Sequence, residues 1–143
     1  MAELTTDPHD LQRYLAAQAP VIDQVRAELR TGRKSSHWMW FIFPQMAGLG
    51  RSETARFYAI GSRDEAAAYL PHPVLGKRLL ECTRLVNAAN GASAEQIFGA
   101  VDAVKFRSCM TLFAAVVPEQ AAFADALRKY FGGVADAATL ERI

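Results

Sequence analysis

The sequence predicts an all-α protein, built as a compact, single-domain, irregular array of about seven to nine helices. Three observations favour this fold class. Alanine, the best helix former, occurs 26 times in 143 residues. Apolar residues recur at helical spacing in most segments of the chain. Residues typical of helix caps stand at the ends of these segments.

Length, composition and charge exclude several classes of protein. A chain of 143 residues and 15.7 kDa is sufficient for one domain, which we expect to span residues 1–143. Hydrophobic residues make up 51% of the chain, which excludes a disordered protein. The net charge of +1 is too low for the basic surface of a duplex-DNA binder, so a nucleic-acid partner is not expected.

No segment of the sequence is typical of export or of membrane insertion. The N-terminus, Met1 to Asp10, lacks the basic start and the apolar run of a secretory signal. The longest nearly uncharged apolar stretch, Phe106 to Val117, is far shorter than the roughly 20 residues of a membrane span. We therefore expect a cytoplasmic protein without a membrane partner.

The N-terminal part of the chain is expected to form two helices. Asp7 and Pro8 predict the cap and the first turn of one helix. A second helix over residues 20–31 ends at Gly32. The basic run Arg30–Lys34 at this helix end is expected to be a solvated turn.

An aromatic segment over residues 37–43 follows. It is apolar on every side except at His37 and stops at Pro44, which predicts a short buried helix. Alternation cannot separate helix from strand in so apolar a segment, but no partner strands are indicated elsewhere. Trp40 and Phe41 lie in the middle, so we expect at least one of them to be fully enclosed.

Caps, prolines and glycines place the remaining helices. Ser62 and Ser93 each have a Glu or Gln at the third following position, which is the spacing of a capping box. Pro73 suits a first helical position. The predicted helices cover residues 52–60, 63–70, 73–90, 93–98, 101–117, 118–130 and 136–142.

The cysteines and histidines are scattered singly along the chain. Cys82 and Cys109 lie within apolar helical patterns, which indicates two buried thiols and not a disulfide. No CxxC, HxxxH or HExxH spacing is present, and Gly48–Gly50 lacks the rest of a phosphate-binding loop. We therefore expect neither a metal nor a cofactor.

The aromatic segment is the first candidate for a binding site. It holds both tryptophans, Trp38 and Trp40, and polar side chains bracket it at His37 and Gln45. Aromatic walls with a few polar groups are typical of pockets for planar ligands. The alternative is a central core helix, since tryptophan and phenylalanine bury large areas.

Two further candidate sites lie later in the chain. Lys105 and Ser108 share a helical stripe with apolar residues, which indicates a site for an anion or a carbonyl. The alternative there is an ordinary Asp102–Lys105 pair on a partly exposed face. His72 immediately precedes a predicted helix, where it lines a pocket, caps the helix or lies in solvent.

Short motifs spread over nearly the whole chain, from Leu11 to Leu140, resemble those of one bacterial family. They combine aromatic, glycine and proline signatures with the polar residues of the candidate sites: His37–Gln45, Gly48–Gly50, Tyr58–Ile60, Glu65–Ala66, Tyr69–Leu70, His72–Pro73, Leu75–Gly76, Ile97–Gly99, Asp102, Lys105, Ser108 and Met110–Phe113. The chain is similar to the domain of unknown function 1810 family, whose members are sometimes mislabelled calpastatin. The resemblance implies a compact helical fold in bacteria and no established activity. Cys109 departs from it, because the resemblance implies a second serine there.

These observations lead to one main hypothesis and two alternatives. The main hypothesis is a small-ligand-binding helical domain whose partner is a small anion. An enzyme of unnamed reaction class, with His37 or His72 as acid/base and Lys105 as electrostatic stabiliser, is the first alternative. A protein-interaction module that uses the basic run Arg30–Lys34 is the second, with RNA binding by the aromatic rings and this run as a weaker variant. The oligomeric state is left open. The expected ligand-binding residues are His37, Trp38, Trp40, Gln45, His72, Lys105 and Ser108.

Overall fold

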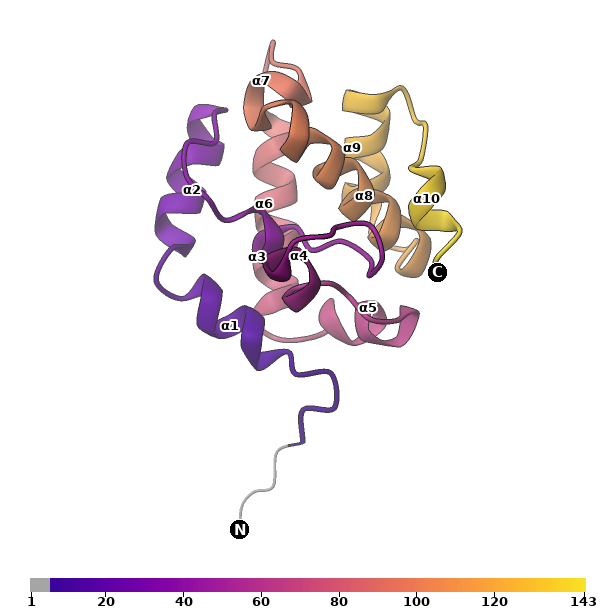
Figure 1. Ribbon diagram of the computed structural model, residues 1–143. Helices are drawn as coiled ribbons and strands as arrows, with labels where there is room; N and C mark the ends of the chain where they lie inside the picture. Colours follow the sequence, from indigo (N-terminus) through magenta and orange to yellow (C-terminus); the bar gives the residue numbers. More distant parts are fainter. Residues whose placement is uncertain (1–5) are drawn as a thin grey trace.

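The protein forms ten helices in the part of the chain that the structure, a computed structural model, describes, residues 6–143 (Figure 1). Residues 1–5, which begin the segment where we expect no secretory signal, lie outside this part. The helices are α1 (Gln12–Gln18), α2 (Ile22–Thr31), α3 (Met39–Ile42), α4 (Glu53–Phe57), α5 (Arg63–Tyr69), α6 (Leu75–Ala88), α7 (Ala94–Phe98), α8 (Ala100–Val116), α9 (Ala121–Phe131) and α10 (Ala137–Leu140).

The all-α fold class is confirmed, whereas the expected number of about seven to nine helices is too low. Four of the ten helices, α3, α4, α7 and α10, have only four or five residues. All four lie within segments predicted as helices, over residues 37–43, 52–60, 93–98 and 136–142, so the segments were found and only their total was set too low. Between residues 6 and 143, no helix is long and apolar enough to cross a membrane.

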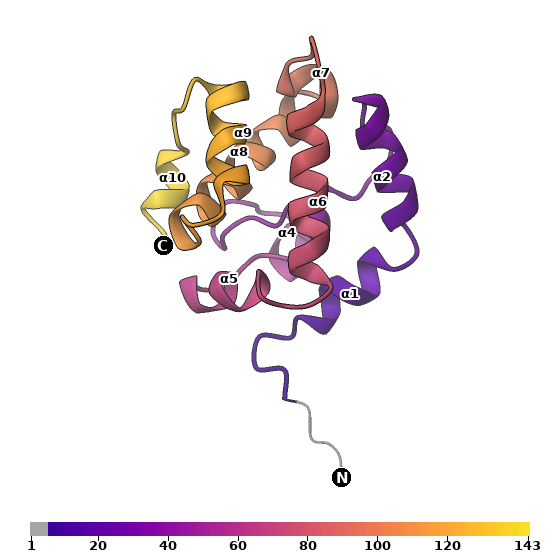
Figure 2. The same ribbon diagram turned by 180° about the vertical axis from the view of Figure 1, so that it is seen from behind.

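Two long helices, α6 and α8, form the centre of the fold. α6 lies between α2 and α9, as Figure 2 shows, and α8 packs against α5, α7, α9 and α10. The start of α6 approaches the end of α5 closely because residue 76 is glycine. A Cβ atom added to Gly76 would lie 1.7 Å from the Leu70 carbonyl oxygen, so no larger residue fits there without a shift of the backbone.

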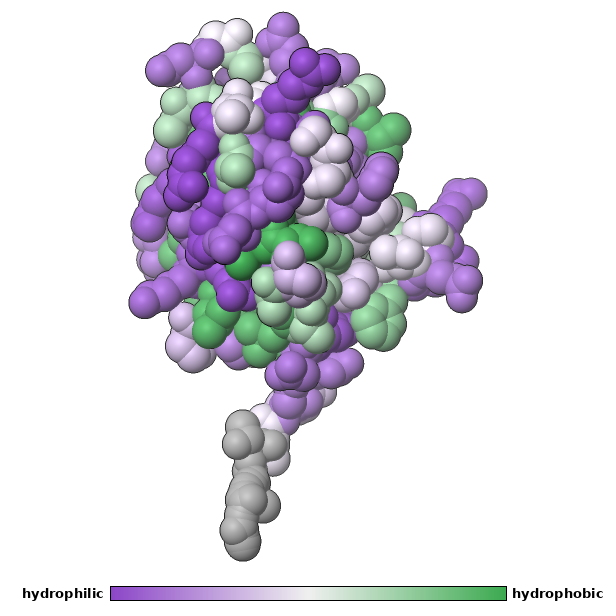
Figure 3. Space-filling view, turned by 90° about the vertical axis from the view of Figure 1, so that its left-hand side faces the viewer, coloured by the Kyte–Doolittle hydropathy of each residue, from purple (hydrophilic) through white to green (hydrophobic). Residues whose placement is uncertain are grey.

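α2 has the pattern of a surface helix. Val25 and Leu29 are buried on the side that packs against α6, and Asp23 and Arg30 are exposed. Gly32 ends the helix in the left-handed conformation, as predicted. Figure 3 shows this side of the molecule, where hydrophilic side chains cover most of the upper half and hydrophobic ones gather lower down.

The predicted capping boxes are confirmed in part. The box at Ser93 is complete. Ser62 accepts a hydrogen bond from the Glu65 amide, but the Glu65 carboxylate binds elsewhere. It accepts from the Gly61 amide at 2.9 Å and forms a nearly buried ion pair with Arg13 at 2.8 Å. This pair ties α1 to the start of α5.

The aromatic segment is buried, but not through the residues expected to be enclosed. Trp40 and Phe41 are both half-buried, so the prediction that one of them is fully enclosed is wrong. The helix here is the single turn Met39–Ile42, and a single turn directs only part of its surface to the core. The fully enclosed rings are Trp38 and Phe43, which flank that turn.

Phe43 joins the aromatic segment to the core around α8. Its ring meets those of Phe98 and Phe106 edge to face, with centroids 5.9 and 5.1 Å away. Phe98 and Phe106 stack on each other with centroids 4.8 Å apart. The three rings therefore fix α3, α7 and α8 relative to one another.

The two cysteines are buried and free, which confirms the expectation of two buried thiols. Burial raises the pKa of Cys82 to about 12 and that of Cys109 well above its ordinary value. Both thiols therefore stay protonated near neutral pH, and a cysteine nucleophile is not indicated.

Replacing Phe43 with alanine is expected to lower the free energy of unfolding by about 3–5 kcal/mol, because the lost ring leaves a cavity beside Phe98 and Phe106. Urea-unfolding curves measure the change. Phe57→Ala is the control, since that ring is 57% exposed and its loss should cost less than about 1 kcal/mol. Equal losses in the two variants would contradict the central position of Phe43.

Candidate functional site

A buried carboxylate organises the connection between α2 and α3. Glu28, on α2, accepts hydrogen bonds from the Ser35 and Ser36 amides at 2.7 and 3.1 Å. The Trp38 indole N–H donates to the same oxygen at 2.9 Å, and the Ser36 hydroxyl and the Gln24 amide bind the other oxygen. Burial alone would raise the pKa of Glu28, but these bonds outweigh burial and lower the pKa from 4.5 to about 2. Glu28 is thus a charged anchor around which the connection folds.

This connection carries Lys34 into the protein. The Lys34 amide donates to the Ile97 carbonyl oxygen of α7 at 2.7 Å. The ammonium group lies 2.8 Å from Asp102 Oδ2 and 5.1 Å from the centre of the Trp38 ring, and the side chain is only 8% exposed. The expectation that Arg30–Lys34 is a solvated turn is therefore wrong at Lys34, because α7 and α8 supply partners from far along the chain.

Asp102, on α8, holds two ammonium groups at once. Lys34 lies 2.8 Å from one of its oxygens, and Lys105 lies 3.2 Å from the other. Burial would raise the pKa of Asp102, but the hydrogen bonds from the two lysines outweigh it and lower the pKa. The Lys105 ammonium also lies 5.0 Å from the centre of the Trp40 ring. We call Lys34, Trp38, Trp40, Asp102 and Lys105 the lysine–tryptophan cluster; it holds two positive charges and one negative charge.

His37 and Gln45 stand at the two ends of the aromatic segment. His37 is exposed, and Gln45 is half-buried. The Gln45 carbonyl oxygen accepts a hydrogen bond from the Ile60 amide at 2.8 Å, which holds this end of the segment against the connection between α4 and α5. A role for either side chain in binding a ligand stays a prediction.

Ser108 makes its contacts with α10. Its side chain is buried, and the hydroxyl oxygen lies 3.1 Å from the Val104 carbonyl oxygen and 3.2 Å from Asp136 Oδ2. The Thr139 amide donates to the same carboxylate oxygen, and the Asp136 amide donates to the Thr111 hydroxyl. This network fastens the start of α10 to α8, so the Ser108 hydroxyl is occupied by a structural contact.

His72 caps a helix. Its Nδ1 accepts hydrogen bonds from the Val74 and Leu75 amides at 3.1 and 3.2 Å, at the start of α6. These contacts support the capping alternative for His72. The residue also borders a hollow of about 290 Å³ together with Asp7 and His9. The structure thus places it with the start of α1.

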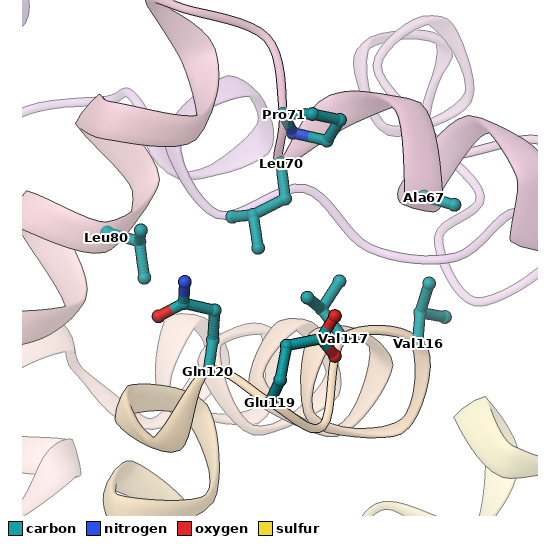
Figure 4. Close-up of a pocket in the computed structure, with 8 residues that line it drawn as sticks. All are labelled: Ala67, Leu70, Pro71, Leu80, Val116, Val117, Glu119 and Gln120. Atoms are coloured by element: carbon teal, nitrogen blue, oxygen red, sulfur yellow. The ribbon is translucent and has the colours of Figure 1, made fainter.

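The hollow that Figure 4 shows, of about 390 Å³, lies between α5, α6 and the connection from α8 to α9. Aliphatic side chains form most of its wall, and Glu119 and Gln120 lie on one side. None of the seven residues expected to bind a ligand lines this hollow. The structure brings Trp40 and Lys105 together at the cluster instead.

Two residues of this region, Glu28 and Lys34, were not predicted as site residues from the sequence. Glu28 borders the apolar stripe of α2, three positions after Val25 and directly before Leu29. An acidic residue at such a position signals a buried carboxylate that needs hydrogen-bond donors, so this signal was present. Lys34 carried no such signal, because its partner Asp102 lies far away in the sequence.

Comparison with known proteins identifies the family. Residues 8–143 match the family described as Protein of unknown function (DUF1810), and the chain belongs to this family. The crystal structure of the conserved hypothetical protein Rv1873 from Mycobacterium tuberculosis, determined at 1.38 Å, has 52% sequence identity to the chain. The two structures share a TM-score of 0.93, covering 94% of this chain and 96% of that one. No curated protein matches the chain.

Acid is expected to destabilise the protein through Glu28. Because folding lowers its pKa from 4.5 to about 2, the charged carboxylate stabilises the folded state above about pH 4.5, and this contribution is lost as the pH falls toward 2. About 2 kcal/mol of it should be lost between about pH 6 and about pH 3. Urea unfolding of the wild type and of Glu28→Gln at the two pH values measures how much of the stability lost on acidification is due to Glu28.

The variant should be less stable than the wild type at the higher pH and should lose less stability on acidification. Glu119→Gln is the matched control, since Glu119 is exposed and its replacement should leave the pH dependence unchanged. An unchanged pH dependence in Glu28→Gln would contradict the anchoring role of Glu28.

Proposed function

We propose that this protein binds a small planar anion, such as a nucleotide or another phosphorylated ring compound, at the lysine–tryptophan cluster. The observation that carries the proposal is that Lys34 and Lys105 share the single carboxylate of Asp102, at 2.8 and 3.2 Å. The Lys105 charge therefore has no carboxylate of its own, since Asp102 is shared with Lys34 and the nearby Glu28 carboxylate is bound to the Trp38 indole. A phosphate or carboxylate group of a ligand would balance it through charge-assisted hydrogen bonds.

Lys105 is the lysine that is free to turn toward a ligand. Its side chain is 21% exposed, against 8% for Lys34. Breaking a buried ion pair is usually costly because it leaves a charge without a partner. That cost does not arise here, since Asp102 keeps Lys34 when Lys105 moves away.

Trp40 supplies a surface on which a ring can stack. Its side chain is half-buried, and the Lys105 ammonium lies close to its face. Stacking of a nucleic-acid base on an aromatic side chain contributes about 1–3 kcal/mol. Trp38 has a different role, because it is fully buried and its N–H is bound to Glu28, so it positions the segment and does not touch the ligand. We include His37, which is exposed and stands three positions before Trp40 in the sequence, as a further hydrogen-bond donor to the ligand.

Titration with adenosine nucleotides, sugar phosphates and inorganic phosphate tests this function, with tryptophan fluorescence and calorimetry as readouts. We expect a nucleotide to bind and to quench Trp40. Lys105→Met keeps the length of the side chain but removes its charge, and it should weaken binding at least about tenfold. Trp40→Leu should weaken it to a similar extent.

Lys77→Met is the matched control. Lys77 is an exposed lysine on α6, so its replacement should leave the affinity unchanged. Two results would contradict the proposal: no probe binds at concentrations up to about 1 mM, or binding occurs and is the same in Lys105→Met and Trp40→Leu as in the wild type. Strong binding of inorganic phosphate with no dependence on Trp40 would show an anion site without a ring platform, which also contradicts the proposal.

A further inference from the structure

One side of α8 is apolar where a surface helix is usually polar. Val101 and Val104, in its first two turns, are 70% and 61% exposed. Farther along the same helix, Met110 and Phe113 are fully buried in the core. In Figure 1, α8 crosses in front of α6 and α9, and no other helix is drawn over its first turns. Two valines exposed to this extent on neighbouring turns leave an apolar surface at this end of α8 without a cover.

The two valines continue into a larger apolar surface. The Arg107 side chain donates to the Val134 carbonyl oxygen at 2.9 Å, which holds the backbone of Val134, a residue that is 58% exposed, beside the first half of α8. A hollow of about 280 Å³ lies here, and part of its wall is Ala100, Ala103 and Phe131. We call Val101, Val104, Val134 and this hollow the α8 patch.

The edge of the α8 patch carries charges of both signs. Glu95, from α7, and Arg107 both line the hollow. Arg107 directs its N–H groups to the carbonyl oxygens of Val134 and Ala135, which do not neutralise its charge. Neither Glu95 nor Arg107 takes part in an ion pair within residues 6–143. The nearby Asp136 is already bound by Ser108 and by the start of α10.

We propose that the α8 patch binds a second copy of this chain in a two-fold symmetric contact. In such a contact the same surface is used by both copies, so Glu95 of one copy can pair with Arg107 of the other, and the reverse pair forms at the same time. A patch with one acid and one base at its edge and valines at its centre is self-complementary in this way. A partner of single charge would leave one of the two groups unpaired. This inference is independent of the ligand site.

Sedimentation velocity of the full chain, from about 1 µM to about 1 mM, tests the contact. The wild type should change from monomer to dimer within this range. Val104→Glu places a charge at the centre of the contact and should weaken self-association at least about tenfold, and Val101→Glu should act in the same direction. Phe57→Glu is the matched control, since Phe57 is a similarly exposed side chain on α4 and its replacement should change nothing. Circular dichroism shows that each variant is folded.

A charge exchange tests the pairing itself. Glu95→Arg and Arg107→Glu should each remain monomeric when alone, because like charges then meet at both ends of the contact. A mixture of the two variants should form a heterodimer, since each Arg then meets a Glu. The proposal is overturned if the wild type stays monomeric throughout, which leaves the patch to another protein or to no partner. It is also overturned if Phe57→Glu is as harmful as Val104→Glu, or if the mixture of folded charge variants stays monomeric.

Discussion

The candidate site depends on the carboxylate of Glu28. This carboxylate accepts hydrogen bonds from the Ser35 and Ser36 amides and from the Trp38 indole N–H, and these bonds set the direction of the chain after α2. That turn places Lys34 beneath α7, within reach of Asp102, and starts α3 with an enclosed tryptophan. Without Glu28, the buried Trp38 N–H would lack its acceptor, which costs more than the bond itself contributes in net terms. Glu28 forms no bond with Asp102 or Lys105, yet it positions the connection that carries Lys34, the partner of Asp102.

Within residues 6–143, the two ion-pair sites with the least exposed side chains differ in their balance of charge. The nearly buried Arg13–Glu65 pair joins one positive and one negative charge, and backbone carbonyl oxygens accept the remaining guanidinium N–H groups. Its role in joining α1 to α5 accounts for it fully. The cluster around Asp102 holds two lysines for one carboxylate, and burying such charges rarely adds more stability than apolar side chains of the same size would. The anion proposed above would balance the charge of the second lysine.

The sequence predicted what is decided locally. The end of α2 at Gly32 and the capping box at Ser93 follow from residues within a few positions of each other. The failures concern contacts made across the fold. Helical spacing shows that Lys105 and Ser108 share a side of α8, but it cannot show that α10 meets Ser108 while Trp40 meets Lys105. Which rings of the aromatic segment are buried depends on the length of α3, which is a single turn. Periodicity does not reveal that length in so apolar a segment.

The side chains of α8 lie in three different surroundings. Phe106 and Phe113 enter the core, Asp102 and Lys105 enter the cluster, and Val101 and Val104 face outward. Such a helix has no continuous polar side, so its sequence does not show which side faces solvent. Only the tertiary structure shows which of its apolar residues stay exposed. All three of its charged residues, Asp102, Lys105 and Arg107, lie in the same half as the exposed valines. Folding explains the buried half of α8 completely and the charged half only in part, which makes the charged half the first place to seek a function of this protein.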